Sequence, residues 1–85
     1  MDESFELRVK LFASVREALG AGEVAVRLPA GADARDLLAA LEARHPALGP
    51  LGPSLAVAVN HAVVGRGHPL AAGDEVALLP PVGGG

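Results

Sequence analysis

The amino-acid sequence predicts a small α+β domain, in which a mixed sheet of four or five strands carries one main helix on one face. Three observations lead to this class. Five short segments have the apolar content or the alternation of strands, one longer segment begins with a helix-start signal, and a loop rich in proline and glycine follows that helix. A chain of 85 residues that is 51% hydrophobic is large enough for one core, so a single folding unit is expected.

Two of the strands are predicted near the N-terminus. Apolar and charged side chains alternate over residues 5–11, which is typical of a strand with one buried face. Phe12 follows directly but falls on the charged side of the alternation, so we expect its ring at the surface. Residues 23–28 alternate in the same way and end at Pro29, which cannot donate a hydrogen bond to a neighbouring strand.

Two helices are expected. Ser14 and Glu17 have the spacing of a capping box, and Gly20 suits a helix end, so a helix of about two turns is predicted with Ser14 as its cap. The main helix is predicted to begin after Asp33, a good N-cap, and to run to about His45. Its apolar stripe consists of Leu37, Leu38 and Leu41.

The second half of the chain is predicted to contain the remaining strands. Residues 46–54 hold three prolines and two glycines and are predicted to be a loop. Strands are predicted over residues 55–60, 62–64 and 75–79, with a turn at Asn60-His61. Residues 65–73 are predicted to be an irregular connection, and Leu70 within it is expected to be buried in the core. The resulting order of β, short α, β, long α, β, β, β favours a β-grasp fold.

The composition argues against several classes of function. A net charge of −3 without a basic run argues against a nucleic-acid partner. Cysteine is absent, and His45, His61 and His68 lack the spacing of metal ligands, so no metal site is expected. The acidic N-terminus has no apolar signal region and no stretch of about 18 residues is apolar, so a cytoplasmic protein with no membrane partner is expected. No residue set combines a nucleophile with a base, so no independent active site is predicted.

The C-terminus carries the most distinctive chemistry of the sequence. Gly83-Gly84-Gly85 has no Cβ atoms, so this end can pass through a narrow channel and present its carboxylate. Pro80-Pro81 before it favours a stiff, extended stem. We therefore expect a folded domain over residues 1–79 and a flexible functional tail over residues 80–85, the alternative being an inert, frayed terminus. A carboxylate becomes a good electrophile once it is converted into an acyl-adenylate, and sulfur can then replace the adenylate.

Several motifs together resemble one protein family. They are His-Pro-Leu at 68–70, Gly-Asp-Glu-Val at 73–76, Leu-Leu-Pro-Pro-Val-Gly-Gly-Gly at 78–85, Val59-Asn60, Leu11-Phe12-Ala13 and Val15-Arg16-Glu17. In this combination the chain resembles the small subunit of molybdopterin synthase, a ubiquitin-like β-grasp sulfur carrier. The resemblance runs over most of the chain and is weakest between residues 21 and 54.

The resemblance implies a function for the tail. An E1-like enzyme would use ATP to adenylate Gly85, and a sulfur-transfer protein would convert the adenylate into a thiocarboxylate. The carrier would then bind the large synthase subunit in a hetero-oligomer, thread its tail into that subunit's active site and pass the sulfur to a pterin precursor of the molybdenum cofactor. The threaded residues would be Pro80, Pro81, Val82, Gly83 and Gly84. This chain would bind no cofactor itself and would act as a non-catalytic, sulfur-donating subunit.

The resemblance also implies a docking surface. Phe12, Val63 and Leu79 are apolar positions near strand ends that resemble the family's exposed contact patch. An ordinary core position is an equal alternative for Val63. Arg16 is expected either to pair with an acidic group on a partner or to be a solvated residue of a helix surface.

Other functions remain open. The Gly83 that precedes the final Gly-Gly gives an ending that resembles the thiamine-pathway carrier, so carriers for thiamine, cysteine or tRNA thiolation are alternatives. A ubiquitin-like protein modifier, in which Gly85 is linked to lysines of other proteins, belongs to a different class. A β-grasp interaction module with an inert tail is the third possibility.

Overall fold

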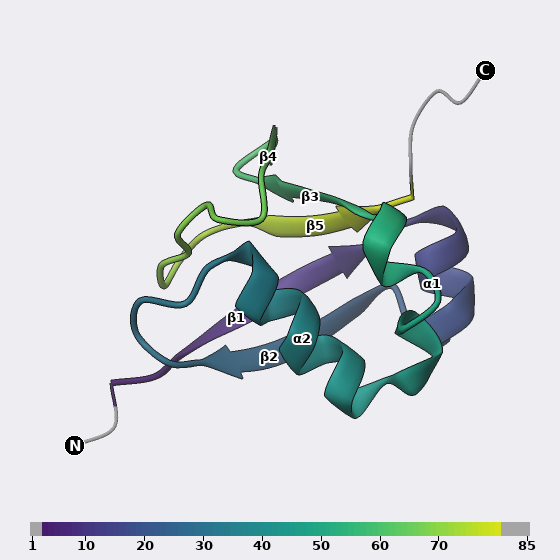
Figure 1. The fold of residues 1–85 in the computed structure, drawn as a ribbon, viewed down its shortest axis with the longest axis horizontal. Coiled ribbons are helices and arrows are strands. Elements are labelled where there is room, and N and C mark those ends of the chain that lie inside the picture. The colour runs from purple at the N-terminus through teal and green to yellow at the C-terminus, as the bar shows by residue number, and fades with distance from the viewer. Residues whose placement is uncertain (1–2, 81–85) are drawn as a thin grey trace.

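Alternating apolar side chains build a sheet with one buried face, as the sequence predicts. The computed structural model describes residues 3–80, and its five strands form one sheet in the order β2-β1-β5-β3-β4 (Figure 1). The strands are β1 (Phe5–Leu11), β2 (Glu23–Leu28), β3 (Ala56–Val59), β4 (Ala62–Val64) and β5 (Val76–Leu79). The helices are α1 (Ala13–Leu19) and α2 (Ala34–Arg44), and two short 3₁₀ turns are η1 (Pro46–Leu48) and η2 (Gly52–Ser54). Because β1 and β5 pair in parallel and the other pairs are antiparallel, the predicted mixed β-grasp sheet is confirmed.

The hydrophobic core lies between the sheet and α2. In β1 the apolar side chains after Phe5 are buried and the charged ones between them are exposed. Leu37 and Leu41 of α2 are fully buried against this face, and Leu38 is partly buried. Leu70 is also buried, as predicted. Within residues 3–80, α2 thus covers one face of the sheet and no helix packs on the other (Figure 1).

Hydrogen bonds fix the start of α2. The Asp33 Oδ1 accepts from the Asp36 N–H at 3.0 Å, and the Asp36 Oδ2 accepts from the Asp33 N–H at 3.0 Å. This arrangement is a capping box and confirms Asp33 as the N-cap. The N–H groups of the first two helical residues donate to the carbonyls of His68 and Arg66. These bonds satisfy amides that have no partner inside the helix and hold the connection between β4 and β5 against it.

The first helix begins differently from the prediction. Its N-cap is Phe12, which makes no side-chain capping bond, so the expected capping box of Ser14 and Glu17 is wrong. Ala13 has a φ of 52°, in the left-handed region, which turns the chain directly from β1 into α1 and places Ser14 inside the first turn. The helix ends as predicted at Gly20, whose φ of 71° suits a residue without a Cβ.

The predicted loop over residues 46–54 is more regular than its composition indicates. Pro46 is the first residue of η1 and Pro53 is the second residue of η2. At these positions a missing N–H removes no internal hydrogen bond. Leu48 is buried and joins the core. The prolines therefore begin short turns here instead of only breaking structure.

Candidate functional site

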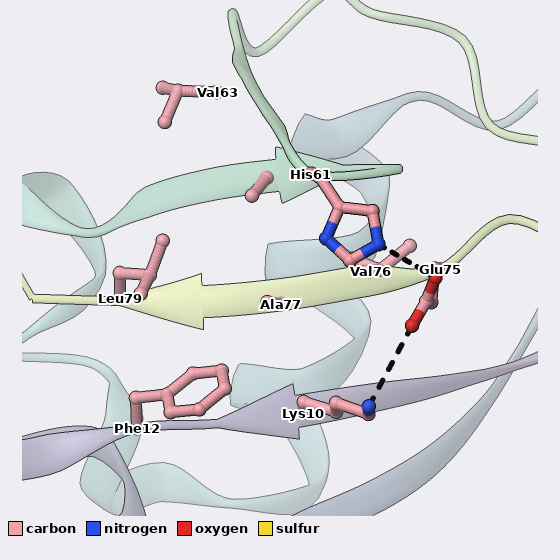
Figure 2. Close-up of a pocket in the computed structure, with 9 residues that line it drawn as sticks. Lys10, Phe12, His61, Val63, Glu75, Val76, Ala77 and Leu79 are labelled. Carbon is pink, nitrogen blue, oxygen red and sulfur yellow. Dashed lines mark ion pairs between the residues drawn. The ribbon is translucent and has the colours of Figure 1, made fainter.

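A shallow groove of about 330 Å³ lies on the sheet face opposite α2 (Figure 2). Its floor is a row of neighbouring residues on four strands, formed by Lys10 of β1, Ala77 of β5, Ala58 of β3 and Val63 of β4. The two alanines in the middle of this row have only methyl side chains. The floor is hollow between the larger side chains that border it, so residue size produces the groove.

One end of the groove is apolar. Phe12 follows Lys10 by two residues in sequence and Leu79 follows Ala77 by two, so their side chains lie on the same side of the groove (Figure 2). Phe12 is 44% exposed and Val63 is 68% exposed, while Leu79 is half-buried. The structure thus brings the three apolar residues singled out in the sequence to one surface, and Val63 is not a core residue. That these residues bind a partner stays a prediction.

The opposite end of the groove is polar. The Glu75 Oε2 lies 3.7 Å from the Lys10 Nζ, and the Glu75 Oε1 lies 3.2 Å from the His61 Nε2 (Figure 2). Each of the three side chains is more than half exposed, so solvent screens the ion pair of Lys10 with Glu75 and the contact of His61 with Glu75, and both contribute little to stability. Chemically, the groove offers apolar contacts at one end and a carboxylate flanked by an ammonium and an imidazole at the other.

A hairpin turn positions the polar end. Asn60 and His61 connect β3 to β4 with φ values of 51° and 73°, which confirms the predicted turn and matches the left-handed pair of a type I′ turn. The Asn60 N–H donates to the Glu75 carbonyl at 2.7 Å, and the Asn60 Oδ1 accepts from the Glu75 N–H at 3.0 Å. The turn is therefore tied to the residue before β5, and this places the His61 ring beside the Glu75 carboxylate.

Arg16 lies outside the groove. It is exposed on α1, and its guanidinium carbon is 3.6 Å from the position that a Cβ would take on Gly22. The guanidinium therefore packs beside the chain between α1 and β2. The Arg16 N–H donates to the Phe12 carbonyl at 3.4 Å, but Arg16 does not line the groove with the three apolar residues. Its proposed ion pair with a partner stays a prediction.

Several residues of the groove were not selected as site residues in the sequence. They are Lys10, Ala58, His61, Glu75 and Ala77. Lys10 and Ala77 could have been found from strand periodicity, because each lies two residues from a position already selected. The contact between His61 and Glu75 depends on the order of strands in the sheet, which no local pattern contains.

The C-terminal tail follows β5 in sequence, and Leu79 of β5 lines the groove. Leu79 ends β5, and Pro80 is the last residue that the structure describes. The predicted threading residues Pro81, Val82, Gly83 and Gly84, and the predicted reactive Gly85, lie outside the described residues. The division into a domain over residues 1–79 and a tail over residues 80–85 therefore stays a prediction.

Among residues 3–80, no group of three His, Cys, Asp or Glu side chains is arranged to hold a metal ion. None of the helices described is both long enough and apolar enough to cross a membrane.

Known proteins resemble this chain over nearly its whole length. Residues 9–85 match the ThiS family. The molybdopterin synthase sulfur carrier subunit of Escherichia coli (strain K12) is 44% identical over 81 residues, which cover 93% of this chain and 99% of that protein. Small archaeal modifier protein 1 of Haloferax volcanii is 40% identical over 84 residues, with 89% and 97% covered.

A solved structure agrees with these sequence matches. The crystal structure of SAMP1 from Haloferax volcanii has a TM-score of 0.82 and 38% identity, and the match covers 94% of this chain and 99% of that one. The resemblance that the motifs indicate is thus confirmed, and the chain belongs to the ThiS family.

Proposed function

We propose that this protein is a sulfur carrier that serves as the small subunit of molybdopterin synthase. In this role an E1-like enzyme uses ATP to adenylate the Gly85 carboxylate, and a sulfur-transfer protein replaces the adenylate to give a thiocarboxylate. The carrier then donates this sulfur to a pterin precursor bound by the large synthase subunit. The identity of 44% with the Escherichia coli sulfur carrier subunit supports this role, and so does the Pro-Pro-Val-Gly-Gly-Gly ending of this chain.

The observation that best supports this proposal is the position of β5. This strand lines the apolar end of the groove and is followed in sequence by the tail that ends in glycine. A partner that covers Phe12, Val63 and Leu79 therefore lies beside the point where the tail leaves the sheet. Residues 80–85 can reach roughly 20 Å when extended, which is enough to enter an active site in that partner. The domain would position the partner, and the tail would deliver the sulfur.

The chain contributes a surface and a donor group, and the partners contribute the catalytic groups. Full burial of an exposed large apolar side chain contributes about 1.5–3 kcal/mol. Phe12 and Leu79 are already partly buried, so each would stabilise the complex by less than this. Arg16, on α1, would add a charged contact with an acidic group of a partner. Glycines at 83 and 84 would let the partner's backbone approach the tail closely on both sides.

Intact-mass spectrometry tests this function. The full chain should be expressed in a host with a working sulfuration system, beside a variant that lacks Gly84 and Gly85. We expect the mass of the full chain to rise by the difference between sulfur and oxygen, and the mass of the shortened chain to stay unchanged. An unmodified full chain in every condition would contradict the proposal. Stable complex formation with a purified molybdopterin synthase large subunit, and not with the thiamine-pathway partner, would assign the pathway.

A second function is favoured by the 40% identity with small archaeal modifier protein 1. In that case the activated Gly85 would form isopeptide bonds with lysines of other proteins. Arg66 is the last basic residue of the chain that trypsin recognises, so digestion would leave residues 67–85 on each modified lysine. Mass spectrometry of such remnants would distinguish a modifier from a carrier that only forms a thiocarboxylate.

A further inference from the structure

The chain contains a single lysine, and the structure places it in the groove. Lys10 is accompanied in the sequence by six arginines, whose guanidinium groups are not acyl acceptors. Its side chain is 53% exposed and lies at the polar end of the groove floor (Figure 2). The only lysine amine of the chain is thus located on the surface that we assign to docking.

We propose that Lys10 is a conjugation site that accepts the activated C-terminal glycine of a second copy of this chain. This inference rests on the proposed function, which supplies a chain with an activated Gly85. It adds an acceptor site to a protein whose tail otherwise acts only as a donor.

The composition of the tail suits the groove. Residues 80–82 are Pro-Pro-Val, which can contact the apolar end at Phe12 and Leu79, and the glycines that follow can pass over the methyl groups of the floor. Lys10 lies two residues back along β1 from Phe12, a distance of about 7 Å in a strand. Three extended glycines reach roughly 10 Å, so a tail seated at the apolar end can bring its terminal carbonyl to the Lys10 Nζ.

The step forms one bond and breaks one bond. The Lys10 Nζ lone pair attacks the carbonyl carbon of the adenylated Gly85, and an amide C–N bond forms. The bond from that carbon to the phosphate oxygen breaks, and AMP leaves with the electron pair. The Lys10 ammonium loses one proton to water before the attack, the nitrogen loses a second proton to water as the amide forms, and no oxidant or reductant is required. The Glu75 Oε2 lies 3.7 Å from the Nζ, at the end of the groove.

A donor prepared chemically tests the site without an activating enzyme. The full chain carrying K10R is made as a thioester at Gly85, so it can donate but has no lysine to accept. The acceptor is the isotope-labelled full chain with an acetylated N-terminus. We expect a covalent dimer in which trypsin leaves residues 67–85 of the donor on Lys10. A K10R acceptor should give at least about tenfold less dimer, because it has no amine left to accept the acyl group, and an acceptor whose lysine lies outside the groove should give as little, because only the groove brings the reacting groups together.

A relocated lysine is the matched control. The K10R/R27K acceptor carries one exposed lysine on β2, outside the groove, and should form no more dimer than the K10R acceptor. Equal yields from Lys10 and from this relocated lysine would overturn the proposal. So would attachment to another residue, or no dimer under conditions in which the thioester acylates free lysine. The sulfuration test uses the unaltered chain and does not depend on Lys10, so failure of either test is distinguishable from failure of the other.

Discussion

Val63 projects from the short edge strand β4 with 68% of its surface exposed. Because it is already exposed, Val63→Asp should change the free energy of unfolding by no more than about 0.5 kcal/mol. Binding to the large synthase subunit should weaken by about tenfold or more, since burying a valine contributes about 1.5 kcal/mol and the new carboxylate would have to lose its water. Calorimetric titration measures the binding, and urea unfolding measures the stability.

Ala25→Asp is the matched control for that residue. Ala25 is exposed on β2 and is paired with Arg8, so it lies on the same face of the sheet but outside the groove. The control should bind as tightly as the unaltered chain. Equal weakening by both substitutions would mean that total charge, and not the groove, determines binding.

The capping box of α2 makes the stability of this element depend on pH. The backbone N–H of Asp36 donates to the Asp33 carboxylate and lowers the pKa of Asp33 below its ordinary value of 3.8. A carboxyl whose pKa is lowered by folding contributes stability that is present above the unfolded-state pKa and is lost as the pH falls through the folded-state pKa. We therefore expect Asp33→Ala to lower the urea midpoint at neutral pH, and the difference from the unaltered chain to shrink as the pH falls below 3.8.

Asp33→Asn separates the hydrogen bond from the charge. An asparagine oxygen can still accept from the Asp36 N–H, and asparagine is about as good an N-cap as aspartate, but it does not titrate. Its urea midpoint should stay near that of the unaltered chain at neutral pH and should lack the contribution of Asp33 to the pH dependence. A deficit of Asp33→Ala that is constant down to the acid range would contradict this account.

Arg66 joins two irregular segments through hydrogen bonds to backbone carbonyls. Its Nη1 donates to Leu55 at 3.0 Å, and its Nη2 donates to Gly52 at 3.0 Å and more weakly to Pro53 at 3.5 Å. Because these bonds involve a charged donor and are partly buried, Arg66→Met should reduce the free energy of unfolding by about 1–3 kcal/mol. Urea unfolding measures this loss. The same change at the exposed Arg27 should stay within about 0.5 kcal/mol, and equal losses at both positions would contradict the role of Arg66.

At the scale of the whole molecule, the periodic features of the sequence were the predictable ones. Alternation identified β1 and β2, and the main helix could be placed from Asp33 because its side chain caps the helix directly. The start of α1 was mispredicted because Ala13 takes a left-handed conformation, and alanine gives no sign of one. The burial of Leu48 was not predicted, because a single leucine in a segment of proline and glycine forms no repeating apolar pattern.

The groove was only partly predictable. Phe12 could be placed at the surface because it follows a long, regular alternation. Val63 could not be placed, because a strand of three residues is too short to reveal which face is buried. The polar end requires β4 and β5 to flank β3, which is a property of the whole sheet. The family was more accessible than the geometry of the groove, since the tail motif is continuous in sequence whereas the groove combines four strands.

Deleting Gly84 and Gly85 should separate the fold from its function. Within residues 3–80, the residues of the core and of the groove lining all precede Pro80, so the free energy of unfolding should change by no more than about 0.5 kcal/mol. Binding to the large synthase subunit should persist, because the groove is unchanged. Thiocarboxylate formation and synthase activity should be lost, because the C-terminal carbonyl of the shortened tail would no longer reach the active sites of the partners. Removing Asp2 and Glu3 at the other terminus is a control of equal size and should retain activity. Synthase activity in the chain without Gly84 and Gly85 would contradict the central role of the tail, since the domain alone offers a binding surface and no group that could donate sulfur.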